Sequence, residues 1–350
     1  MKKRLLGFFL LCMVVGASAQ DIHYSQFFNS PLTLNPALTG LTKGRVRVGA
    51  IYRNQWFSGI NNGSSGFGNS PYQTPSVFVD APIKIKEYDI VGVGGMFLYD
   101  KAGAGSLGTF QIIASGSYIK SLGVKHNHQL SVGLQIGWTQ LKISQADLQF
   151  ANQFDQNNQF QGSIASNVGL KPNTNYANIN IGLLYYGRFS KMLSMYVGGA
   201  FYNAASMKYN LEANNEKRDL YYRGNAQVGF DVAFGKYHIL PSVLFMQQST
   251  ADQLNIGLGF GYDFSEKTTL TLGLYVRGND ITNKYNQADA VIPYFAAEFT
   301  SYKIAVSYDA TVSKFKAAGA GVGALEISFI YTLMQKGKLP LNNFLYCPRY

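Results

Sequence analysis

The stretch Leu254–Phe264 reads LNIGLGFGYDF and alternates without interruption. One face carries the large side chains of Leu254, Ile256, Leu258, Phe260, Tyr262 and Phe264. The other face carries only Asn255, Gly257, Gly259, Gly261 and Asp263. A period of two is that of a β-strand, and this pairing of bulky apolar with small or polar residues is typical of a strand between lipid and a crowded or wet interior. A strand of a soluble sandwich has the reverse sense, with its apolar groups inward.

The composition of the whole chain favours the same class of protein. Aromatic residues make up 14% and glycine 37 of the 350 residues, while charged residues reach 14%, against about 25% in soluble domains. No run of about 18 apolar residues follows position 19, so no transmembrane helix is predicted. We therefore expect an all-β fold, a transmembrane antiparallel outer-membrane β-barrel.

The amino terminus has the pattern of a secretory signal peptide. Residues 2–4 are Lys-Lys-Arg, residues 5–15 form an apolar run and residues 17–19 read Ala-Ser-Ala, which predicts cleavage after residue 19. Residues 20–43 have turn chemistry and many apolar side chains, so we expect an N-terminal lead-in, or plug, packed against or inside the barrel. The predicted barrel covers residues 44–334 and a periplasmic tail covers residues 335–350.

Alternation continues along the rest of the chain. We place about fourteen strands, within a range of twelve to sixteen, at residues 44–56, 75–85, 88–100, 106–121, 127–142, 175–189, 192–203, 219–235, 237–248, 252–264, 267–278, 290–300, 302–313 and 321–334. Long and short connections mostly alternate, as expected for external loops and periplasmic turns. The connection at 249–251 is predicted to be external and yet is short. Between residues 83 and 99 both faces are apolar, so the pattern does not fix the register there.

The long connection 144–174 contains FANQFDQNNQFQG. It fits either a polar surface loop or a loop that binds a partner or folds into the lumen, because its three phenylalanines are costly to expose together.

No pattern for catalysis or for cofactor binding emerges. The glycine clusters at 92–95, 257–261 and 319–323 lie in or beside strands and precede no helix, unlike phosphate loops. His126 and His128 lack a third metal ligand, and no serine nucleophile can be matched to a histidine. We expect no enzyme activity, no cofactor and no metal. The net charge of +11 suits anionic lipid headgroups or an acidic protein, whereas no nucleic-acid motif is present.

Six charged residues fall on the small-residue faces of strands, namely Arg223, Asp231, Asp263, Arg277, Asp309 and Glu326. An arginine facing hydrocarbon costs about 2–4 kcal/mol at mid-depth, so we expect these side chains to point inward as an interior charge network. That network would either lock the barrel and its lead-in or line a conducting lumen. Asp309 and Glu326 lie on adjacent strands and would repel each other unless a cation such as Arg53 or Arg277 lies between them.

Several short motifs resemble those of one family. They are SQFF at 25–28, NPALTG at 35–40, YRNQW at 52–56, SYD at 307–309, GALEIS at 323–328 and CPRY at 347–350. Together they closely resemble the PorP/SprF family from end to end, although the middle of the chain carries no recognisable family motif.

This resemblance implies a non-enzymatic outer-membrane component of the Bacteroidota type IX secretion and gliding motility apparatus. Members either work beside a periplasmic ring lipoprotein and its partner or escort and anchor a surface adhesin, so these proteins and outer-membrane lipid are the expected partners. The resemblance assigns structural or partner-contact roles to Asn35, Pro36, Arg53, Gln55, Trp56, Tyr308, Asp309 and Glu326. A porin-like diffusion channel is the alternative function.

Overall fold

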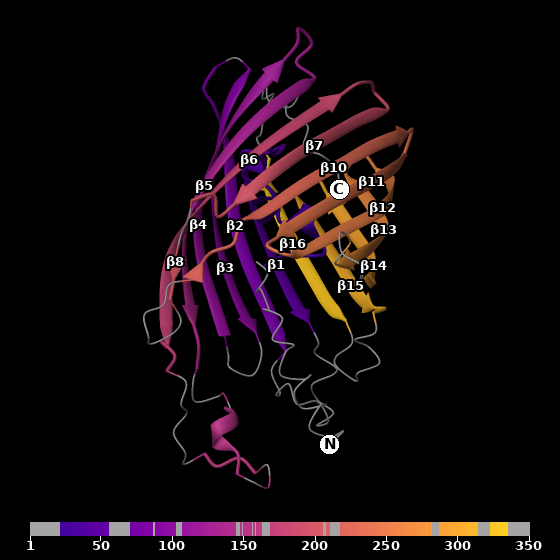
Figure 1. Ribbon diagram of the computed structural model, residues 1–350. Coiled ribbons are helices and arrows are strands. Elements are labelled where there is room, and N and C mark those ends of the chain that lie inside the picture. Colours follow the sequence, from indigo (N-terminus) through magenta and orange to yellow (C-terminus); the bar gives the residue numbers. More distant parts are fainter. Residues whose placement is uncertain are drawn as a thin grey trace.

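The computed structural model describes residues 22–55, 71–86, 88–102, 107–144, 148, 150–155, 157, 159–162, 169–205, 208–210, 218–279, 281, 287–313 and 323–334. In these residues fourteen antiparallel strands close into one barrel (Figure 1). The predicted fold class and strand number are therefore confirmed. The predicted signal peptide, Trp56 and the predicted tail lie outside the described residues.

The strands of the barrel, in chain order, are β1 (Val46–Gln55), β2 (Tyr72–Lys84), β3 (Asp89–Ala102), β4 (Leu107–Leu122), β5 (His128–Lys142), β6 (Asn173–Arg188), β7 (Leu193–Tyr202), β10 (Arg223–Phe234), β11 (Tyr237–Gln248), β12 (Ala251–Ser265), β13 (Thr268–Asn279), β14 (Gln287–Phe299), β15 (Tyr302–Thr311) and β16 (Ala324–Leu333). Each pairs with its neighbours in this order, and β1 pairs with β16 to close the barrel. The short strands β8 (Lys208–Tyr209) and β9 (Arg218–Asp219) form a separate hairpin in the β7–β10 connection.

Strand β5 shows why the alternating sequence produces this wall. Its apolar residues point outward and are 37–58% exposed, namely Leu130, Val132, Leu134, Ile136 and Trp138. On the inner face Ser131, Gln135 and Thr139 are at most 2% exposed. A barrel in lipid requires this arrangement, because its outer surface meets hydrocarbon while small and polar groups fill the interior.

The two ends of the barrel differ in their connections. One end, here called the short-turn end, holds tight turns such as Gly235-Lys236 between β10 and β11 and Thr300-Ser301 between β14 and β15. The opposite, long-loop end holds the connections 143–172 and 203–222. The connection from β11 to β12 is also at the long-loop end, and it is the two-residue turn Ser249-Thr250. The expected short connection at this end is thus a real feature of the fold.

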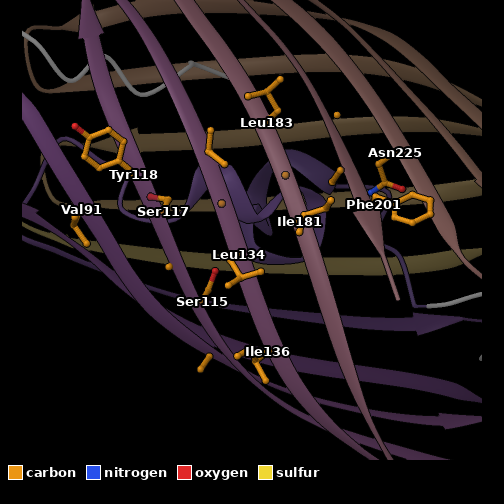
Figure 2. Close-up of a pocket in the computed structure, with 17 residues that line it drawn as sticks. Val91, Ser115, Ser117, Tyr118, Leu134, Ile136, Ile181, Leu183, Phe201 and Asn225 are labelled. Carbon is orange, nitrogen blue, oxygen red and sulfur yellow. The ribbon is translucent and has the colours of Figure 1, made fainter. Parts of the chain in front are cut away.

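The segment 22–42 lies inside the barrel, where it forms η1 (Phe27–Asn29), the single helical turn α2 (Pro31–Leu34) and η2 (Pro36–Leu38). Figure 2 shows these turns behind the wall strands. The segment starts near the long-loop end, where the carbonyl of Ile22 accepts a bond from Arg223 at the start of β10, and it leaves at the short-turn end before β1. None of the helices in the described part of the chain is long and apolar enough to cross a membrane.

The apolar inner face of β3 has a local explanation. Met96 and Leu98 pack inside the barrel against Tyr24 and Leu32 of the lumenal segment. Both faces of β3 are apolar because one meets the outside of the barrel and the other meets this segment. The register that the sequence left open is therefore set by what fills the lumen.

Candidate functional site

The site is the lumenal segment 22–42 together with the wall residues that hold it. At its start, both oxygens of the Glu326 carboxylate accept backbone N–H groups, from Ser25 at 2.8 Å and from Gln26 at 2.8 Å. The side-chain amide of Gln26 donates to Ser307 Oγ at 3.0 Å and to the carbonyl of Glu326 at 3.0 Å. All four residues are buried. The wall thus binds the backbone of the segment through a charge-assisted contact, which is stronger than a neutral one.

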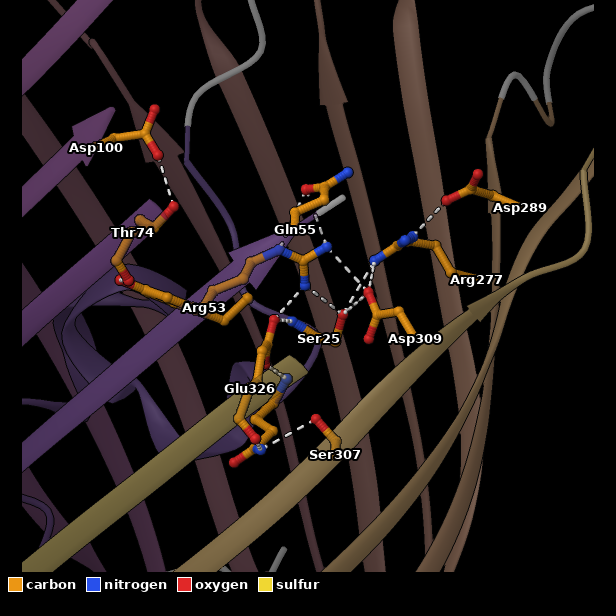
Figure 3. Close-up of polar contacts among 12 residues, drawn as sticks. Ser25, Arg53, Gln55, Thr74, Asp100, Arg277, Asp289, Ser307, Asp309 and Glu326 are labelled. Atoms are coloured by element: carbon orange, nitrogen blue, oxygen red, sulfur yellow. Dashed lines mark hydrogen bonds and ion pairs between the residues drawn. The ribbon is translucent and has the colours of Figure 1, made fainter. Parts of the chain in front are cut away.

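Two arginines complete this cluster (Figure 3). Arg53 bonds to Glu326 and to Asp309, the latter at 2.9 Å. Arg277 bonds to Asp309 at 2.7 Å and to Asp289 at 2.8 Å. Both guanidinium groups also donate to Ser25 Oγ, at 2.9 Å and 3.0 Å, and Ser25 in turn donates to Asp309 at 2.7 Å.

The strand register explains how these distant residues meet. Arg53 of β1 is directly opposite Glu326 of β16, and Asp309 of β15 is opposite Ala324, two residues away from Glu326. The two carboxylates therefore lie close together, with Arg53 between them. A buried charge whose partner is removed is strongly destabilising, at about 3–5 kcal/mol, so these wall charges depend on one another, and together they hold Ser25.

The middle of the segment is fixed by Asn35 and Pro36. Asn35 Oδ1 accepts the N–H of Ala37 at 2.9 Å and so caps η2, while Pro36 occupies the first position of that turn. Asn35 Nδ2 donates to two wall carbonyls, of Leu183 on β6 and Gly199 on β7, at 3.1 Å each. One amide side chain therefore both shapes the turn and ties it to the wall.

Glycines in the wall make room for this turn. A Cβ atom on Gly133 of β5 would overlap the backbone of Pro36, and one on Gly182 of β6 would overlap Asn35 Oδ1. These positions lie on the inner face of the barrel. Only glycine allows such close approach of a second backbone.

The end of the segment is held by a second buried ion pair. Asp80 of β2 accepts from Arg47 Nε at 2.9 Å and Nη2 at 2.7 Å, and from the N–H of Gly40 at 2.7 Å. Arg47 Nη2 also donates to the carbonyl of Leu38 at 3.2 Å. Gly40 has a φ of +72°, and a Cβ atom there would overlap Gly92 of β3. The last residue of the NPALTG motif must therefore be glycine for two independent reasons.

Further wall side chains bond to the backbone carbonyls of the segment. The donors are Ser117, Ser131, Gln135, Tyr202, Asn225 and Arg223, at distances from 2.6 to 3.3 Å. Of these only Arg223 stands out in the sequence. The others are ordinary small or polar residues on inner strand faces, and alternation alone does not show what they bond.

Apolar contacts anchor the segment on the β13–β14 side. Phe28 packs its ring 5.4 Å from that of Tyr275 and 5.0 Å from that of Tyr294, and Phe27 lies 6.3 Å from Tyr275. All four side chains are at most 4% exposed. Such buried aromatic pairs contribute about 0.5–1.5 kcal/mol each beyond their buried area.

The six charged residues singled out in the sequence do not form one network. Arg277, Asp309 and Glu326 belong to the cluster around Ser25. Arg223 lies over the ring of Tyr202, 3.9 Å from its centroid, beside the start of the segment. Asp231 and Asp263 instead meet His238, at 2.8 Å and 3.1 Å, near the short-turn end.

The remaining family-motif residues are spread over both sides of the wall. Gln55 accepts from Arg53 at 3.3–3.4 Å and so extends the cluster. Tyr308 points outward and is 37% exposed, so it takes no part in the cluster. His238 was not a candidate from the sequence, since only strand pairing places it between two aspartates.

The contacts described for this site all hold the lumenal segment in place. Among the described residues, no group of three or more His, Cys, Asp or Glu side chains is arranged to hold a metal ion. Cavities beside the segment measure about 30 and 20 Å³ near the long-loop end. Each has the volume of about one water molecule. The segment is thus closely packed in the lumen at this end.

These features define a class of protein, an outer-membrane β-barrel whose lumen is occupied by its own N-terminal segment. The model of one family, described as type IX secretion system membrane protein PorP/SprF, matches residues 16–331. The chain belongs to the PorP/SprF family. It is a membrane protein of the type IX secretion system, and the expected family is confirmed.

The chain is also similar to solved outer-membrane barrels. The toluene transporter TbuX of Ralstonia pickettii has 11% identity and a TM-score of 0.48, covering 87% of this chain and 94% of that one. The toluene transporter TodX of P. putida has 10% identity and a TM-score of 0.48, covering 88% and 95%. The translocator domain of the autotransporter NalP of Neisseria meningitidis has 13% identity and a TM-score of 0.39, covering 83% and 89%. No curated protein matches the chain.

Proposed function

We propose that this protein is a non-enzymatic platform in the outer membrane, which binds or anchors a secreted surface protein or the periplasmic ring of the type IX secretion and gliding apparatus. The single observation that carries this proposal is the way in which Glu326 holds the lumenal segment. A diffusion channel needs an open lumen, whereas here a buried carboxylate binds two backbone N–H groups of a segment that runs through the barrel.

A lumen filled by segment 22–42 would leave the two ends of the barrel as the surfaces for partners. By the rule for outer-membrane barrels, the short-turn end faces the periplasm and the long loops face outward. The predicted signal peptide supports export to this location. The periplasmic ring would then meet the short turns, and a surface protein would meet the loops.

The long β5–β6 connection is the best candidate for contact with a surface protein. In its described part, Phe154 and Phe160 face each other with ring centroids 5.7 Å apart, and they are 38% and 42% exposed. Figure 1 shows the helical turn of this loop beyond the ends of the strands. Exposed aromatic pairs outside the membrane are typical of protein contacts, and this position favours a partner-binding loop over a lumen-folding one.

The experiment is recovery of partners from the native outer membrane in mild detergent, followed by their identification. We expect type IX secretion proteins or a surface adhesin with the wild type, and loss of the adhesin with Phe154→Ala combined with Phe160→Ala. The matched control is Phe295→Ala combined with Phe329→Ala, because these two side chains are similarly exposed, at 44% and 46%, on the lipid-facing wall. Recovery of bulk porins and lipid alone, with normal adhesin display in a deletion strain, would refute the proposal.

A further inference from the structure

The outer wall of the barrel is hollowed where β3 to β7 pass the lumenal segment (Figure 2). This groove has a volume of about 1100 Å³. Its outward side chains are apolar, among them Val91, Val132, Leu134, Ile181 and Phe201. Its floor includes the small outward residues Ala114, Gly116 and Gly199.

The hollow follows from the size of the outward side chains. On β4 and β7, Gly116 and Gly199 present no side chain to the outer surface. On β5 and β6 between them, the outward residues are large and exposed, among them Val132, Leu134 and Ile181. The groove is thus a low floor beside apolar rims.

Basic residues lie at one end of the groove. Beyond the facing pair Val91 and Tyr118, the next outward-facing pair toward the short-turn end is Asp89 and Lys120. The side chain of Lys120 is 55% exposed, and Asp89 is already engaged by Lys120 at 3.7 Å and by the Tyr118 hydroxyl at 2.7 Å. Lys86 and Lys125 are also exposed in the adjoining turns. The described residues at this end thus expose three lysines, and Asp89 is paired with one of them.

The groove is short enough to lie within one leaflet of a bilayer. From the facing pair Tyr118 and Val132 to the pair Ala114 and Ile136, the groove spans four residues of β4 and β5, or about 13 Å along the strand. Strands of such barrels tilt by about 35–45°, so the groove covers roughly 10 Å along the membrane normal. This fits within half of a hydrocarbon core of about 30 Å. The lysines then lie at the level of the headgroups, where long basic side chains reach the interface.

We propose that this groove is a binding site for an anionic glycerophospholipid of the periplasmic leaflet. An acyl chain lies on Ala114 and Gly116 between the apolar rims, and the phosphate pairs with Lys120 and Lys86. The charge at the end of the groove selects this occupant over a neutral lipid, and the apolar lining excludes a polar peptide. The choice of the periplasmic leaflet rests on the proposed function, in which the short-turn end faces the periplasm. The binding of the lipid does not depend on that orientation.

The experiment is native mass spectrometry of the full mature chain in neutral detergent, titrated with phosphatidylglycerol or with phosphatidylcholine of the same acyl chains. We expect one phosphatidylglycerol to be retained at least tenfold more tightly. Lys86→Gln combined with Lys120→Gln should abolish this preference, and Ala114→Leu should weaken the binding of both lipids by filling the floor. Gly116→Leu provides a second filling variant, because a Cβ atom there meets only the Gly92 carbonyl, at 3.8 Å.

Matched controls test whether the effect belongs to the groove. Lys236→Gln combined with Lys267→Gln removes two lysines from other short turns, and Ala297→Leu makes the same apolar change on β14 across the barrel. The controls should bind phosphatidylglycerol as the wild type does. Equal retention of the two lipids by the wild type, or equal loss in variants and controls, would show ordinary annular lipid and overturn the inference. Selective lipid binding without recovery of secretion partners would refute the proposed function alone.

Discussion

The contact of Glu326 with the lumenal segment yields the sharpest prediction. In Glu326→Gln one carboxylate oxygen becomes an NH₂ group, so one of the two backbone N–H groups, of Ser25 or Gln26, faces a donor. A buried donor left unsatisfied costs about 1–3 kcal/mol. Arg53 also loses one of its two anionic partners but keeps Asp309. The total loss of stability should therefore not exceed the roughly 3–5 kcal/mol of a fully broken buried pair.

The expected total is about 3–4 kcal/mol, acting on the start of the segment. Hydrogen–deuterium exchange of the reconstituted protein measures this directly, because each 1.4 kcal/mol of local opening corresponds to about a tenfold faster exchange. The amides of Ser25 and Gln26 should exchange at least 100-fold faster. The amide of Gly40, which donates to Asp80 at 2.7 Å at the other end of the segment, serves as an internal control and should change little.

A second variant calibrates the effect. Ser307→Ala removes one neutral bond to Gln26, of 3.0 Å, and should cost only about 1 kcal/mol. If Glu326→Gln left the exchange of Ser25 and Gln26 unchanged, or raised exchange equally along the whole segment, the reasoning that this carboxylate holds the segment would be refuted.

Three further predictions concern the lumenal turn and the β5–β6 loop. Gly133→Leu should lower the thermal unfolding temperature strongly because its side chain must displace the lumenal turn, while Gly116→Ala, on the outer face, should leave that temperature nearly unchanged. Asn35→Asp turns a donor to two strand carbonyls into an acceptor and should lower stability by about 3 kcal/mol in urea unfolding; stability equal to the wild type would contradict the assigned bonds. In the β5–β6 loop, the backbone N–H of Gln159 holds the pKa of Asp155 below its ordinary value. The ionised Asp155 therefore stabilises the loop fully above about pH 4, and this stabilisation is lost as the pH falls through the lower pKa of the folded state. Amide exchange in the loop should show this pH dependence, and Asp155→Asn should remove it.

Much of the fold was predictable because a barrel in lipid imposes a period of two on every strand. Strands β5 and β12 show this most clearly, and the short turn at Ser249-Thr250 was visible from the spacing of the strands. The apolar residues of segment 22–42 required burial, so the sequence predicted that it packs either against the barrel or inside it. Its direction, from the long-loop end to the short-turn end, was not predictable because no local pattern specifies it.

The site was less predictable, because strand pairing and the lumenal segment decide which residues meet. The sequence predicted a cation, such as Arg53 or Arg277, between Asp309 and Glu326, but the role of Ser25 between the two arginines emerges only in three dimensions. Asp231 and Asp263 had the same pattern as the others, yet they lie beside His238. The alternating pattern shows which side chains point into the barrel. Their depth along the barrel axis depends on the register of the strands, which the pattern does not give.

The central claim is that the N-terminal segment closes the lumen, and single-channel conductance in planar bilayers tests it most directly. The full mature chain should be nearly silent, and a chain lacking residues 22–42 should show large, stable ion currents. Steady porin-like conductance of the full chain that does not increase after the deletion would contradict the account and favour a diffusion channel.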